Sequence, residues 1–191
     1  MKKIVLTFGL ICGAVIAALM LATVPFMHKM GMSGGLVIGY TSMVLAFLLV
    51  FFGIRSYREN VGNGYVSFRR AVGVGLLIML IGCAFYVITW EIVYFNFMPD
   101  FVEKYAAFAL EDARAHGASA AELAKQTEDM RKFQQMYSNI FYNVAFTSLE
   151  PLPVGLVMTL ISAVILRRNR KDLHDGQDEV KGNPVTRVNP V

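Results

Sequence analysis

Long apolar segments without a charged side chain dominate this sequence and restrict the folds open to it. The first covers residues 4–26, which contain no Asp, Glu, Lys or Arg, and a second covers residues 34–54. About 20 apolar helical residues cross the roughly 30 Å hydrocarbon core of a bilayer. Backbone polar groups must be bonded within the chain there, because the core holds no water. We therefore predict two membrane-spanning α-helices, joined by a short connection over residues 28–34.

Two further spans follow later in the chain. A third apolar segment covers residues 71–94, with Ser67 as a candidate N-cap, and a fourth ends at Leu166 before a basic cluster. The 14 residues counted from Pro153 to that end extend only about 21 Å, which is too short to cross. Residues back to about Phe141 are therefore expected to share the crossing through a kink at the prolines.

Residues 97–148 have the composition of a charged helical hairpin between the third and fourth spans. Apolar spacing predicts one helix over residues 100–116, ended by Gly117. Ser119, followed three residues later by Glu122, is a capping-box signature for the next helix. The expected apolar stripe of that helix is Leu123, Met130, Phe133, Tyr137, Ile140, Phe141 and Val144. The predicted fold is an all-α polytopic membrane protein with four transmembrane helices and a helical hairpin between the third and fourth.

The distribution of basic residues predicts the orientation, since cytoplasmic connections carry an excess of Lys and Arg. With the N-terminus inside, twelve basic residues lie inside and six outside. An even number of spans then puts the C-terminus inside as well. Residues 1–171 form the membrane domain, and the polar residues 172–191 are predicted to be a disordered cytoplasmic tail. The arginines that set this topology are Arg55, Arg58, Arg69, Arg70, Arg167, Arg168 and Arg170.

The basic residues of the chain allow two other interpretations. Lys2 and Lys3 before an apolar segment are also typical of a cleavable signal peptide. The segment is longer than the about 7–15 residues of a signal core, and no Ala-x-Ala site precedes Pro25, which favours a retained helix. The net charge of +4 does not indicate nucleic-acid binding, because the basic residues flank the spans.

Several short motifs recur together with this layout. A Gly64-Tyr65-Val66-Ser67-Phe68 stretch leads into the third segment, the charged insertion begins Pro99-Asp100, and the last segment opens with Glu150-Pro151-Leu152-Pro153. Over about residues 1–171 the chain resembles the Bacteroidota membrane proteins grouped as "domain of unknown function 4199". The resemblance implies a bacterial inner-membrane protein and supplies no activity, cofactor or catalytic residue.

Glu91 and Glu150 are the candidate functional residues, because an ionisable side chain at membrane depth is costly. About 20 residues separate Glu91 from Arg70, which places it near the outer interface, where Trp90 and Tyr94 fit an aromatic belt. Glu150 adjoins a proline break about 25 Å from the arginine-marked end of the last span. The two carboxylates either share a polar pocket beneath the hairpin, or serve as an interfacial residue and a helix cap, and the second alternative is favoured.

Small residues recur at helical spacing in the first segment. Gly9, Gly13 and Ala17 form one small-xxx-small stripe, which permits close helix packing. Ala14, Ala18 and Ala22 form another. Such stripes are frequent in apolar helices, so neither assigns a dimer.

The sequence contains no constellation typical of catalysis. His28, His116 and His174 lack metal-ligand spacing, and Gly62-Asn63-Gly64 lacks the Lys of a phosphate-binding loop. We therefore expect neither a cofactor nor a metal, and no enzyme, with a lipid-modifying membrane enzyme as the remaining enzymatic alternative. The predicted function is a non-enzymatic structural or accessory component of the inner membrane. Its partners would be the lipid bilayer and, through the outer hairpin, a second copy or another membrane protein. The alternative is a small proton- or ion-coupled transporter or channel, acting as a homo-oligomer.

Overall fold

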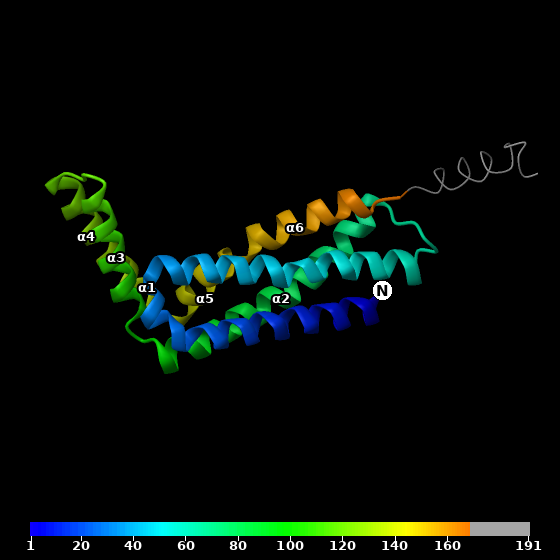
Figure 1. Cartoon of the computed structure of the whole chain (residues 1–191), viewed down its shortest axis with the longest axis horizontal. Helices are drawn as coiled ribbons and strands as arrows, with labels where there is room; N and C mark the ends of the chain where they lie inside the picture. Colours follow the sequence, from blue (N-terminus) through cyan, green and yellow to red (C-terminus); the bar gives the residue numbers. More distant parts are fainter. Residues whose placement is uncertain (169–191) are drawn as a thin grey trace, which may run out of the picture.

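The computed structural model describes residues 1–168, apart from the side chains of residues 27–30. Arg170, His174 and the predicted tail over residues 172–191 lie outside the described residues. Within this range the regular elements are all helices, arranged as an elongated bundle with a projecting hairpin (Figure 1). They are α1 (Lys2–Asn60), α2 (Phe68–Phe97), α3 (Phe101–Ala115), α4 (Ala120–Tyr137), α5 (Ile140–Leu149) and α6 (Pro151–Leu166).

Four helical segments are long and apolar enough to cross a membrane, which confirms the predicted fold class. They are Lys2–Phe26, Gly31–Asn60, Phe68–Phe97 and Ile140–Leu166. One end of the bundle holds the N-terminus, the loop between α1 and α2 and the last turn of α6. We call it the arginine end. The opposite end holds the reversal of α1 and the α3–α4 pair, and we call it the hairpin end (Figure 1).

The reversal of α1 is shorter than the sequence predicted. The predicted connection over residues 28–34 is too long. The chain is helical on both sides of a single non-helical residue, Gly31 (φ 69°, ψ 177°). These angles lie in a region that is open essentially to glycine alone. The helix therefore stops and resumes in the opposite direction without an intervening loop (Figure 1).

The last span is fastened to the loop at the arginine end. Val66 and Arg168 form an isolated antiparallel bridge, in which the amide N of Arg168 donates to the carbonyl O of Val66 at 3.0 Å. Ser67 occupies the predicted N-cap position of α2, but its side chain makes no capping hydrogen bond.

The hairpin begins as predicted and ends earlier. Gly117 has a positive φ of 82°, and Ser119 and Glu122 form the reciprocal capping box at the start of α4. The helix stops at Tyr137, whereas the predicted hairpin ran to residue 148. Asn139 caps a new helix, because its side chain accepts a hydrogen bond from the amide of Phe141 at 3.0 Å. The stripe residues Ile140, Phe141 and Val144 therefore belong to α5.

The fourth span is built from α5 and α6, as the short distance from Pro153 required. The candidate span Ile140–Leu166 crosses the break before Pro151, so the predicted kink and the contribution of residues before the prolines are confirmed. Proline has no N–H to donate and its ring displaces the preceding turn, which explains why the break falls here. Glu150 is the residue at the junction.

Helices α1, α2 and α6 pack around one core. Surrounding lipid is as apolar as the core, so close packing rather than removal from water must hold such helices together. Small residues permit this approach: a Cβ on Gly155 would collide with Met79, and a Cβ on Gly75 would collide with Thr159. The fully buried side chains of the core include Phe47, Val50, Ile54, Val74 and Ile78.

Candidate functional site

A pocket opens at the hairpin end, between the two halves of α1, the end of α2, the start of α3 and the α5–α6 junction. Its volume is about 120 Å³. Most of the wall is aliphatic or aromatic, and Tyr40, Tyr86, Trp90 and Phe101 supply rings to it. Among the described side chains that line it, Glu150 has the one carboxyl group, and there is no Lys or Arg.

Glu150 is held in this pocket by a tyrosine from another helix. The hydroxyl of Tyr86 on α2 donates to Oε2 of Glu150, at the α5–α6 junction, across 2.5 Å. Within the described residues, Oε1 of the same carboxylate accepts no hydrogen bond. The helix break places the carboxylate at this height, about 24 Å from the end of α6 by the rise of the helix. The site can therefore offer one free carboxylate oxygen to a ligand.

Trp90 joins the pocket to the base of the hairpin. Its indole Nε1 donates to the hydroxyl of Tyr137, the last residue of α4, at 2.8 Å. Thr147 Oγ1 donates to Asn143 Oδ1 at 3.0 Å, so the Tyr137 hydroxyl is left to donate to Thr147 across 3.3 Å. Burial raises the pKa of Tyr137, which keeps this phenol protonated as that role requires.

Aromatic rings reinforce the same junction. Phe101, at the start of α3, packs edge-on against Trp90 with ring centroids 4.8 Å apart. Tyr94 contacts both Trp90 and Tyr137, with centroids at 6.4 Å and 5.3 Å. Such pairs contribute about 0.5–1.5 kcal/mol each beyond the area that they bury. The hairpin is thus attached to the bundle by one aromatic cluster (Trp90, Tyr94, Phe101, Phe133 and Tyr137) and by the hydrogen bonds of Tyr137.

The structure separates the two candidate carboxylates. Glu150 lines the pocket, whereas Glu91 is not among the lining residues, although both act electrostatically on Tyr137. The two carboxylate oxygens of Glu91 are buried and have no hydrogen-bond partner within the described part of the chain. The Nδ2 of Asn143 is likewise buried without an acceptor there.

The two small-residue stripes of the first span face different surroundings. A Cβ on Gly9 would meet Ile81, and one on Gly13 would meet Phe85, so this stripe packs against α2 of the same chain. Ala17 is partly buried. The stripe Ala14, Ala18 and Ala22 is exposed on the bundle surface.

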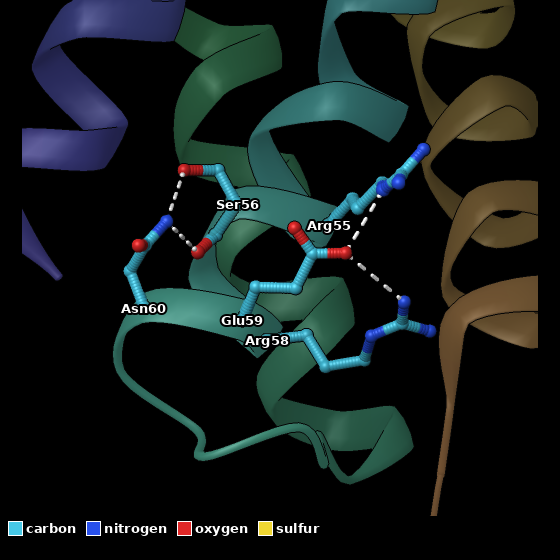
Figure 2. A network of polar contacts seen from close by, with 5 residues as sticks. All are labelled: Arg55, Ser56, Arg58, Glu59 and Asn60. Carbon is cyan, nitrogen blue, oxygen red and sulfur yellow. Dashed lines mark hydrogen bonds and ion pairs between the residues drawn. The ribbon is translucent and has the colours of Figure 1, made fainter.

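The arginines at the opposite end form a polar network of their own. Figure 2 shows Glu59 between Arg55 and Arg58, with its Oε1 at 2.9 Å from Arg55 Nε and 3.4 Å from Arg58 Nη2. Asn60 donates to both the carbonyl and the hydroxyl of Ser56. These groups lie at the end of α1, away from the pocket. Arg167 and Arg168, just after α6, are exposed.

The carboxylates in the described part of the chain do not form a metal-binding group. Among residues 1–168, no group of three or more His, Cys, Asp or Glu side chains is close enough to hold a metal ion. Both cysteines, Cys12 and Cys83, are buried and free. His116 contacts the carbonyl of Asp112 on the surface of α3.

Sequence reasoning missed the aromatic residues that line the pocket together with Glu150. Tyr86 and Trp90 are four residues apart and share a face of α2, which is a detectable signal. Their pairing with Glu150 and Phe101 depends on how α2 is aligned with the α5–α6 break and with the start of α3. No local pattern encodes that alignment.

One comparison with known proteins identifies a family. The family model described as "Protein of unknown function (DUF4199)" matches residues 7–168, which is most of the chain. No curated protein and no solved structure matches it. The matched range contains the motifs that carried the resemblance to this family, which is thereby confirmed. The chain belongs to the DUF4199 family of membrane-type proteins of unknown function.

Proposed function

We propose that this protein is a non-enzymatic accessory component of the bacterial inner membrane, and that the α3–α4 hairpin is its partner-binding surface. The observation that carries the proposal is the projection of the hairpin beyond the bundle (Figure 1). Its attachment is confined to the base, where Tyr137 and Val102 are buried with Tyr94. Most of the polar surface of α3 and α4 is therefore free to contact another protein.

Basic residues support an orientation with both termini in the cytoplasm. The arginine end also holds the N-terminus. Its arginines include Arg58 and Arg69, on either side of the α1–α2 loop, and Arg167 and Arg168, just after α6. The hairpin, by contrast, holds more acidic than basic residues. The positive-inside rule assigns the end that is richer in Lys and Arg, here the arginine end, to the cytoplasmic face. The hairpin would then lie in the periplasm.

Site-specific photo-crosslinking in living cells tests the partner-binding surface. A photoreactive residue in place of Glu111 or of Lys125, both exposed on the hairpin, should give a discrete adduct. The same residue in place of Val61, exposed at the arginine end, is the matched control and should not give that adduct. An adduct of about twice the 21.2 kDa chain would identify a second copy, and a different mass would identify another protein. Identical products from both ends, or none from the hairpin, would contradict the proposal.

A second candidate function, proton- or ion-coupled transport by a homo-oligomer, is favoured by one specific observation. Glu150 lies in a pocket at membrane depth with one carboxylate oxygen unpaired within the described chain. Carboxylates in such places often serve ion pathways. Proton or sodium flux into proteoliposomes should then be lost in Glu150→Gln and retained in Glu111→Gln. Flux that is equal in the two variants would eliminate this candidate.

A further inference from the structure

The hairpin-end pocket has the charge of a site for a single cation. Glu150 is the one acidic residue among its described lining residues, and no described Lys or Arg side chain lines the wall beside it. Tyr86 occupies Oε2 and leaves Oε1 free. Glu150 is exposed, so a ligand can reach its carboxylate, and the apolar wall beside it lowers the local polarity, which strengthens the attraction to a cation.

The wall of the pocket favours an organic cation over a metal ion. Sodium and divalent ions need several oxygen ligands around them, whereas this wall is mainly aliphatic and aromatic. Within the described residues, the pocket contains one carboxylate and no cluster of ligating side chains. Tyr40, Tyr86, Trp90 and Phe101 instead provide aromatic rings, which attract alkylammonium groups through their negative faces.

The size of the pocket limits the cation. Its volume of about 120 Å³ is somewhat below the roughly 150 Å³ of an apolar cavity that admits benzene. A trimethylammonium group fits such a space, and a cation with several fused rings does not.

From these three observations we infer that the hairpin-end pocket is a binding site for a small alkylammonium group, with Glu150 as its counter-ion. The group can belong to a soluble compound such as choline or to the head group of a membrane lipid. The site shares Glu150 with the transport alternative but requires binding alone. Choline binding without flux would therefore support this inference and count against transport.

The protein carries its own reporter for the test. Trp90 is the single tryptophan of the chain, and it lines the pocket. Choline titrated into the full chain in detergent should change the Trp90 fluorescence with saturation. The neutral analogue 3,3-dimethyl-1-butanol, which has the same shape, should bind at least about tenfold more weakly, because it lacks the charge. Equal responses to both compounds, or a saturable response to sodium but none to choline, would overturn the inference.

Three variants test whether the change in Trp90 fluorescence comes from choline binding in this pocket. Glu150→Gln should weaken choline binding at least about tenfold, and Tyr40→Leu should weaken it several-fold through the loss of one ring. Glu111→Gln, on the exposed hairpin, should bind as the parent does. Circular dichroism of each variant shows that the fold is kept. Unchanged binding by a folded Glu150→Gln protein would refute the assignment.

Lipid nanodiscs distinguish the two sources of the group. If a head group is the natural occupant, choline should bind more weakly in phosphatidylethanolamine nanodiscs than in phosphatidylglycerol nanodiscs, because the lipid amine competes. Equal binding in the two membranes identifies a soluble alkylammonium compound as the natural ligand. Either result is consistent with the chemistry of the pocket, whereas absence of choline binding in both membranes contradicts it.

Discussion

Single glycines determine how closely the helices approach one another. Gly155 lies where a Cβ would collide with Met79, whereas Gly73 has open space around it. We expect Gly155→Leu to lower the free energy of unfolding by about 1–3 kcal/mol through overpacking. Gly73→Leu, the matched control on α2, should change it little. Thermal unfolding in one detergent, followed by circular dichroism, compares the two, and equal losses would show that the close approach is not what holds α2 and α6 together.

Glu91 is a buried carboxyl group whose oxygens have no hydrogen-bond partner within the described chain. A buried polar group without a partner costs about 1–3 kcal/mol. Glu91→Met should therefore raise the thermal unfolding temperature. Glu111→Met, at an exposed hairpin position, is the control and should not. A drop in stability on replacing Glu91 would mean that this carboxyl group has an essential partner.

At the residue scale, sequence patterns succeeded where chemistry is local. Gly117 and the Ser119–Glu122 pair were predicted from their spacing and have the expected geometry. The break at Asn139 was missed, because apolar residues keep the same helical spacing on both sides of it. Periodicity reports which side of a helix is apolar, and a small change of direction leaves that signal intact.

The reversal of α1 depends on the backbone angles of one residue, Gly31. Gly31 adopts φ 69° and ψ 177°, a combination that is strongly unfavourable for every residue except glycine. Gly31→Ala should destabilise the protein by about 1–3 kcal/mol. Gly39→Ala, a helical glycine with free space, should instead stabilise it slightly through better helix propensity. Chemical denaturation of the two variants provides the measurement, and an unchanged Gly31→Ala would show that the reversal tolerates other backbone angles.

The start of α4 is expected to respond to pH. Hydrogen bonds from the backbone amide of Ser119 and from its hydroxyl lower the pKa of Glu122. Because the pKa is lower in the folded hairpin than in the unfolded chain, the stabilisation is present above the usual glutamate pKa and is lost as pH falls through the lowered value. The ¹³Cα shifts of the first turn of α4 should then lose helical character on going from about pH 7 to about pH 3.

Glu122→Gln separates titration from capping. The amide oxygen of glutamine can still accept from Ser119, but it does not titrate. The variant should therefore show a smaller pH response in the first turn of α4. If the response stays as large, another group causes it.

For the whole molecule, the number of spans followed from hydropathy and length alone, because a bilayer imposes both. The candidate site did not follow. Glu150 was identified by its position next to a proline break, but its partner Tyr86 is 64 residues away in the chain. The contact depends on how α2 and α6 align in the bundle, and that alignment is set by packing at positions such as Gly155.

Cysteine labelling tests the proposed orientation of the whole bundle. Ala121→Cys places a thiol on the hairpin, and Val61→Cys places one at the arginine end. A membrane-impermeant maleimide should label the first from the periplasmic side and the second after the inner membrane is opened. The native Cys12 and Cys83 are buried and should stay unlabelled. The reverse order of labelling would show that the arginine end faces the periplasm.

The double role of Trp90 has a thermodynamic consequence. One ring forms part of the pocket wall and also holds Tyr137 at the foot of the hairpin. If a protein that binds α3 and α4 displaces this indole, it changes the affinity of the pocket for its ligand. By linkage, a ligand in the pocket must then change the affinity of that protein for the hairpin by the same factor. A membrane-embedded occupant and an aqueous partner would in this way regulate each other without touching.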